Sequence, residues 1–116
     1  MTVFFGFALA DSMFAGEVVI HRRSLTVDEA RERITAGVVP ALNPSHEATI
    51  SAMRARYGID VPIPETPPRI GLTPGDSVIV MGVRGLPRLT DRHEYTEEEI
   101  ASATFTFSEY SVGEES

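Results

Sequence analysis

His46 is the residue whose type and surroundings most favour chemistry. It is the third residue of a helix that we predict to begin at Asn43 and Pro44, a typical N-cap and first-turn pair. The exposed amides and the positive end of the helix dipole there favour an anion such as phosphate. A protonated imidazole at that position is suited to general acid catalysis. The alternative is that His46 only caps or packs against its own helix. We interpret His21 and His93 as surface residues.

Arginine is the second group suited to a phosphate ligand, and all ten basic residues of the chain are arginine. Arg88 follows a strongly apolar segment, the position where binding residues are often found in open sheets. Its planar guanidinium matches a phosphate group, and an ordinary loop ion pair with Asp91 is an equally good interpretation. Thr49 lies one turn after His46, so it can share the same ligand.

The composition excludes several other kinds of chemistry. The chain has no cysteine and no lysine, so it lacks thiolate ligands, a cysteine nucleophile and a Schiff-base or P-loop lysine. His46 and Glu47 are not followed by a second histidine at helical spacing, so they do not form a zinc-protease motif. Gly82 and Gly85 do not lead into a predicted helix, as a phosphate-binding loop would. We therefore expect no metal site and no cofactor.

The segments between these residues predict the order strand, strand, helix, helix, strand, short helix, strand. The predicted strands cover residues 2–10, 17–22, 77–83 and 104–108, and the predicted helices cover residues 26–35, 44–57 and 96–101. Capping boxes mark two of the helix starts, Thr26 with Glu29 and Thr96 with Glu99.

The pattern of apolar and polar residues in two segments indicates where they lie in the sheet. Residues 2–10 are continuously apolar, so we expect a strand in the middle of the sheet, covered on both faces. Residues 104–108 alternate, so we expect a half-exposed edge strand. The predicted fold is α+β (mixed α/β), a single domain with a mixed sheet of about five strands flanked by helices.

A chain of 116 residues is long enough for one core and too short for two. We expect one domain over residues 1–112, followed by an acidic C-terminal tail at 113–116. The apolar start lacks a basic region and a cleavage site, and no apolar run is long enough to span a membrane. We therefore expect a cytoplasmic protein with no membrane partner.

The formal charge of −7 is unevenly distributed. Residues 1–93 contain as many acids as arginines, whereas residues 94–116 contain no arginine. The acids of this last segment are Glu94, Glu97, Glu98, Glu99, Glu109, Glu114 and Glu115. We expect these side chains to face solvent and to repel long nucleic acids, while a small anionic ligand still reaches Arg88.

Three motifs occur together in a recognisable order. The segment from Asn43 to Thr49 reads Asn-Pro-Ser-His-Glu-Ala-Thr, Leu72 to Asp76 reads Leu-Thr-Pro-Gly-Asp, and Pro87-Arg88-Leu89 follows. From Thr2 to Val112, this order resembles the anti-CRISPR ring nucleases of archaeal viruses and phages. The resemblance implies a homodimer that binds cyclic oligoadenylate, typically the four-membered ring, across its two-fold axis. It also implies metal-independent cleavage of this messenger, which silences type III CRISPR signalling, in the host cytoplasm if the gene is viral.

The resemblance further implies roles for individual residues. His46 matches the catalytic histidine, which donates a proton to the departing 5′-oxygen when the ribose 2′-hydroxyl attacks the phosphate. Arg88 matches the arginine that holds the phosphate, and Asp91 stands where the family often has a glutamate. Thr49 matches a threonine that contacts the ligand.

Other positions depart from the family pattern. Phe7 and Ala10 replace the usual Asn and Ser near the end of the first strand, with Ser12 as the nearest polar residue, and Arg69 substitutes for an arginine expected at Pro67. The residues predicted to contact substrate are Phe7, Ser12, Ser45, Thr49 and Arg69. These departures keep two alternatives open, a protein that binds a cyclic nucleotide without cutting it and a structural or partner-binding protein.

Overall fold

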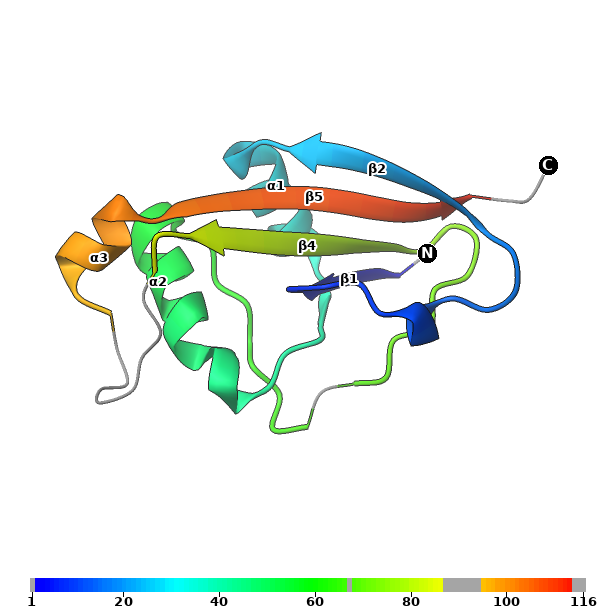
Figure 1. Ribbon diagram of the computed structural model, residues 1–116, viewed down its shortest axis with the longest axis horizontal. Helices are drawn as coiled ribbons and strands as arrows, with labels where there is room; N and C mark the ends of the chain where they lie inside the picture. Colours follow the sequence, from blue (N-terminus) through cyan, green and yellow to red (C-terminus); the bar gives the residue numbers. More distant parts are fainter. Residues whose placement is uncertain (1, 67, 87–94, 114–116) are drawn as a thin grey trace.

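A mixed five-stranded sheet is the centre of the fold in the computed structural model, which describes residues 2–66, 68–86 and 95–113 (Figure 1). Its order is β2-β5-β4-β1-β3. The strands are β1 (Val3–Gly6), β2 (Val19–Leu25), β3 (Val39–Pro40), β4 (Ser77–Arg84) and β5 (Thr104–Gly113). The α-helices are α1 (Val27–Ala36), α2 (Glu47–Tyr57) and α3 (Glu97–Ser102), and single 3-10 turns form η1 (Asp11–Met13) and η2 (Pro44–His46). The predicted α+β class is confirmed.

Strand β1 lies between β4 and β3 and is parallel to both. Successive side chains of a strand point to opposite faces, and both Phe4 and Phe5 are buried, so the predicted strand is covered on both faces as expected. It is shorter than predicted because it ends at Gly6, and residues 8–10 are exposed. The apolar run therefore continues beyond the strand that it indicated.

Strand β5 was predicted wrongly. Residues 104–108 do not form an edge strand, because β5 runs to Gly113 and pairs antiparallel with β2 on one side and β4 on the other. Phe105 and Phe107 point into the helix-covered core, while Thr104 and Thr106 are exposed on the opposite face. The alternation arises because a central strand can also have one covered face and one open face.

All three helices pack on one face of the sheet. Side chains of α1 and α2, with Ile100 of α3 at the margin, form one core with Phe5, Ile79 and Phe107. In Figure 1, α1 lies behind the sheet. None of the described helices is long and apolar enough to cross a membrane.

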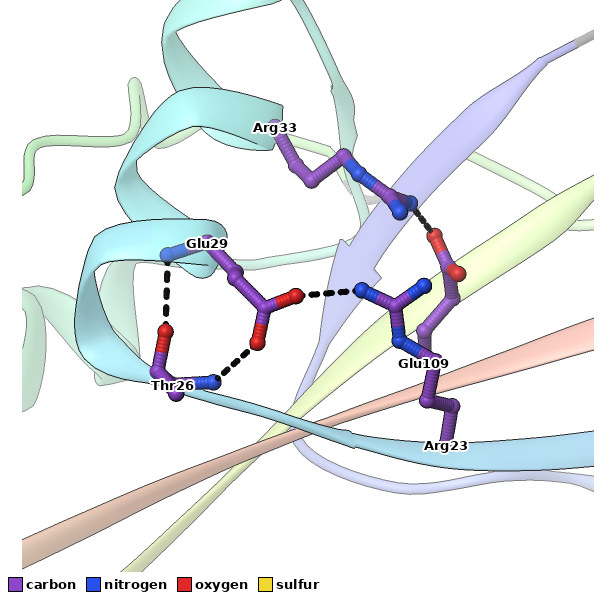
Figure 2. Close-up of polar contacts among 5 residues, drawn as sticks. All are labelled: Arg23, Thr26, Glu29, Arg33 and Glu109. Atoms are coloured by element: carbon purple, nitrogen blue, oxygen red, sulfur yellow. Dashed lines mark hydrogen bonds and ion pairs between the residues drawn. The ribbon is translucent and has the colours of Figure 1, made fainter.

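Local polar contacts fix where the helices begin and end. The Oγ1 of Thr26 accepts the N–H of Glu29, whose carboxylate accepts the N–H of Thr26, so the predicted capping box of α1 is confirmed (Figure 2). The capping box predicted at Thr96 begins α3 in the same way. Helix α2 ends at Gly58, whose φ of 70° lies in the left-handed region that favours glycine.

The second face of the sheet is covered only in part. Phe4, Val78 and Val112 pack there against Ile70 and Leu72 from the connection before β4. No helix covers the remaining part of this face among the described residues. We call this remaining part, formed by β2, β5 and the second half of β4, the open face.

Candidate functional site

The parallel strands β1, β3 and β4 end at one edge of the sheet. Open α/β sheets commonly bind ligands outside the carboxyl ends of their strands. Phe7 follows β1, the segment from Asn43 to His46 follows β3, and β4 ends at Arg84. The fold therefore brings the predicted catalytic histidine to the edge where a ligand site is expected.

His46 lies where a 3-10 turn becomes an α-helix. Turn η2 ends at His46, and α2 begins directly at Glu47. Asn43 caps the turn, because its Oδ1 accepts the backbone N–H of Ser45 at 2.9 Å, and Pro44 occupies the first position. The helix start predicted from Asn43 and Pro44 is confirmed, with a first turn that is 3-10 rather than α.

The imidazole of His46 folds back toward the start of this turn. The backbone N–H of Asn43 donates a hydrogen bond of 3.1 Å to Nδ1 of His46. Histidine thus occupies the place that Glu or Gln has in a capping box. An Nδ1 that accepts a hydrogen bond carries no proton, so the neutral ring is protonated at Nε2. Nε2 is the nitrogen left for a ligand.

An aromatic residue directly after β1 also contacts the imidazole. The rings of Phe7 and His46 pack edge to face, with centroids 4.6 Å apart and an interplanar angle of 68°. Phe7 in turn contacts Phe5, which is fully buried. Partial burial lowers the pKa of His46 below its ordinary value of 6.5, because desolvation penalises the charged ring. Phe7 therefore helps to hold the ring of His46 in place.

Two more of the predicted residues lie beside His46. The hydroxyl of Ser45 donates to Oδ1 of Asn43 and is exposed. Thr49 is half-buried and lies one turn further along the helix, where side chains three positions apart are neighbours. The structure thus gathers Phe7, Ser45, His46 and Thr49 around the start of α2.

Ser12 and Arg69 form a second group. They line one shallow pocket together with Ile70 and Gly71. The backbone N–H of Leu72 donates to the carbonyl of Met13 at 2.7 Å, which keeps these two segments together. This pocket is not lined by His46, so the structure places the predicted substrate contacts in two separate groups.

Arg88 and Asp91, the other predicted catalytic residues, lie outside the described residues, as does His93. Their roles remain predictions. The chain that leads to them leaves β4 at Arg84, beyond Val80, which pairs with the end of β1 at Gly6, and Leu86 packs against the core. Within residues 2–66, 68–86 and 95–113, no three His, Asp or Glu side chains come together as a metal-binding group.

Asn43 was not among the residues predicted for the site, although it contacts the imidazole directly. Its backbone N–H fixes Nδ1 of His46, and its side chain caps the same turn. A signal for this contact was present in the sequence. An Asn followed three residues later by a side chain that can accept a hydrogen bond matches the capping-box spacing, with an imidazole nitrogen in place of a carboxylate.

Comparison with known proteins shows similarity in the fold. No protein-family model and no curated protein sequence matches the chain. A solved structure, B116 of Sulfolobus turreted icosahedral virus, superimposes with a TM-score of 0.67 at 16% sequence identity. The match covers 95% of this chain and 98% of the viral chain. The protein thus has the same fold as a viral protein over nearly its whole length.

Proposed function

We propose that this protein is a metal-independent ring nuclease that cleaves a cyclic oligoadenylate, with the four-membered ring as the first substrate to test, and so antagonises type III CRISPR signalling. The observation that carries the proposal is the arrangement of His46. Its ring is fixed at Nδ1 by Asn43 and packed by Phe7, which leaves Nε2 for a ligand, and it follows the carboxyl end of the parallel strand β3. The family resemblance also implies a mixed sheet flanked by helices, and the observed fold agrees with that.

In the proposed reaction, the 2′-hydroxyl beside the scissile phosphate attacks phosphorus in line. The O2′–P bond forms as the P–O5′ bond breaks, the departing O5′ takes a proton from Nε2 of His46, and the hydroxyl proton passes to solvent. The products are linear oligoadenylates that end in a 2′,3′-cyclic phosphate. General acid catalysis of this kind contributes about 10²–10⁴-fold in rate. Arg88 holds the phosphate, and Asp91 orients Arg88 or the attacking hydroxyl.

His46 must be an imidazolium to donate this proton, whereas the free protein favours the neutral ring. Protonation at Nδ1 breaks the hydrogen bond from Asn43, and partial burial lowers the pKa of His46 further. A phosphodiester anion beside the ring acts in the opposite direction, because a nearby negative charge favours the protonated form. Substrate binding therefore raises the pKa of His46, and the acid forms when its substrate is present.

Two observations favour functions without turnover. The lowered pKa leaves less imidazolium at neutral pH, which suits a protein that binds a cyclic nucleotide and sequesters it uncut. The hydrogen bond from Asn43 to Nδ1 gives His46 a capping role that requires no ligand, which suits a structural or partner-binding protein.

One experiment separates the three functions. Purified protein, His46→Ala and His21→Ala are incubated with cyclic tetraadenylate in EDTA, and the products are separated by chromatography. His21 is exposed on β2 and serves as the matched control. We expect linear products from the unmodified protein and from His21→Ala, and binding without cleavage by His46→Ala. Recovery of the intact ring from a tight complex with unmodified protein indicates sequestration. Absence of both binding and cleavage indicates that the protein acts on a different partner.

A further inference from the structure

The open face differs in charge from the rest of this acidic molecule. Side chains alternate between the two faces of a strand, so alternate residues of β2, β4 and β5 share the open face. These residues are Ile20, Arg22, Ser24, Val80, Gly82, Arg84, Thr104, Thr106, Ser108 and Tyr110. They include two arginines, five hydroxyl groups and no carboxylate, in a chain whose formal charge is −7. The open face is therefore a cationic, hydroxyl-rich surface.

Arg22 is held in a defined orientation on this face. Its Nε donates to the hydroxyl of Tyr110 at 3.1 Å, and its Nη2 donates to Oγ of Ser108 at 3.0 Å. Within the described part of the chain, Nη1 makes no hydrogen bond and no carboxylate pairs with the guanidinium. An exposed arginine usually loses rotamer entropy when it binds, and here that loss has already occurred in the fold.

A shallow hollow lies beside Arg22. The hydroxyl residues that line it are Ser24, Thr26, Thr106 and Ser108. Gly82 pairs with Thr106 across β4 and β5, and a Cβ at Gly82 would lie only 2.8 Å from Oγ1 of Thr106. A side chain larger than hydrogen at Gly82 would therefore displace the Thr106 hydroxyl. Its donors match a phosphate group, since hydroxyls and a guanidinium fork both donate to phosphate oxygens.

The carboxylates near this region are neutralised by other arginines. Ion pairs join Arg23 to Glu29, Arg31 to Asp28 and Arg33 to Glu109. Figure 2 shows the first and third of these pairs, in which Glu29 of α1 contacts Arg23 of β2 and Glu109 of β5 contacts Arg33 of α1. These arginines on the helix-covered side are paired with carboxylates, whereas Arg22 on the open face is held by hydroxyl groups.

We propose that the open face binds a phosphodiester group of a short single-stranded oligonucleotide. Arg22 is the charged contact through Nη1, and the hydroxyls of Ser24 and Thr106 are the neutral donors. Tyr110 and Ser108 are positioning residues, because they hold the guanidinium rather than the ligand. The site uses neither His46 nor cleavage, so it is independent of the function proposed above.

The test uses fluorescence anisotropy with a labelled six-nucleotide deoxyadenylate, which has no 2′-hydroxyl and cannot undergo the proposed cleavage. We expect Arg22→Gln to weaken binding about tenfold at low salt, the size expected for a hydrogen bond to a charged group. We also expect it to reduce the slope of log K against log salt by about one, as for one lost phosphate contact. Arg23→Gln is the matched control, because it makes the same charge change at the next residue of β2, on the opposite face.

Tyr110→Phe tests the positioning without changing any charge. It removes the hydroxyl that accepts from Nε of Arg22, so we expect weaker binding with an unchanged salt slope. Inorganic phosphate is added as a competitor. If the site binds an oligonucleotide, we expect phosphate to displace the labelled deoxyadenylate only at high concentration. Displacement of the label at low phosphate concentration would mean that the hollow binds free phosphate instead.

Three results would overturn the proposal. The first is an equal loss of binding in Arg22→Gln and Arg23→Gln, which indicates an effect of total charge. The second is no measurable binding by the unmodified protein at low salt. The third is that Arg22→Gln binds the oligonucleotide as the unmodified protein does but has a different oligomeric state in sedimentation. That result would mean that the open face is a contact between copies of the chain.

Discussion

The two nitrogens of His46 have different tasks. Nδ1 accepts the N–H of Asn43 and completes the cap of the turn that leads into α2, while Nε2 is left for a ligand. His46 can therefore cap the turn through Nδ1 and act in catalysis through Nε2 at the same time. A substitution that keeps one task and removes the other can separate them.

His46→Glu is that substitution, because a carboxylate at this position forms the ordinary capping box. We expect its free energy of unfolding in urea to stay near that of the unmodified protein. His46→Ala should lose about 0.5–2 kcal/mol, the usual cost of a lost cap. Neither variant should cleave cyclic tetraadenylate. Cleavage by His46→Glu at the unmodified rate would show that the imidazole is not the acid.

The lowered pKa of His46 also predicts how stability depends on pH. Folding favours the neutral ring, so its contribution to stability is complete above the ordinary value of 6.5 and is lost as pH falls through the lower pKa of the folded state. We expect the unmodified protein to lose more stability than His46→Gln between pH 7 and pH 5. Urea unfolding across this range measures the difference. Parallel pH profiles of the two proteins would contradict the assignment.

Among the elements, the helix starts were predictable from the sequence and the position of β5 was not. A capping box is complete within four residues, so Thr26 with Glu29 and Thr96 with Glu99 indicated α1 and α3 correctly. The place of β5 depends on β2 and β4, which are distant in sequence, and alternation alone does not distinguish an open central strand from an edge strand.

The same distinction applies to the site. His46, Ser45 and Thr49 could be grouped from the sequence because one helix start carries all three. The contact of Phe7 with the imidazole, and the pocket that Ser12 shares with Arg69, required the sheet to bring distant segments together. The hydrogen bond from Asn43 was detectable in principle, because it follows a local spacing rule.

Helix α2 positions His46, and its end gives a prediction for the helix itself. Gly58 has a φ of 70°, and no atom lies within 4 Å of a Cβ built there. Gly58→Ala should therefore destabilise the protein through backbone strain alone, by about 1 kcal/mol. Gly71→Ala is the control, because Gly71 also has open space and does not have a positive φ. Urea unfolding compares the two, and equal effects would contradict the explanation by strain.

Over the whole molecule, ion-paired charges, the arginines of the open face and a cluster of acids lie in different places. The helix-covered side contains paired arginines and carboxylates, the open face has arginines without acids, and the first turn of α3 contains Glu97, Glu98 and Glu99. Acids in the first turn of a helix interact favourably with its dipole. Glu99 also caps α3 by accepting the N–H of Thr96, so it is part of the fold.

The predicted repulsion of long nucleic acids is tested by neutralising only the two acids that do not cap α3. The double substitution Glu97→Gln with Glu98→Gln should increase nonspecific binding of long RNA, more at low salt than at high salt. Glu17→Gln with Glu65→Gln makes the same charge change at exposed positions in other segments. Filter binding at several salt concentrations measures the difference. If the two double variants bind RNA equally, the location of the acids on α3 is irrelevant.

The central place of β5 has a consequence for how the protein is made. Residues 104–113 are the last of the described strands to leave the ribosome, yet they separate β2 from β4 and pair with both. Until then β2 has no strand partner among the described elements, and one side of β4 is also unpaired. Unpaired strand edges promote aggregation, and distant pairings form slowly. The sheet therefore closes in one late step, so nascent chains that stop before residue 104 should depend on chaperones.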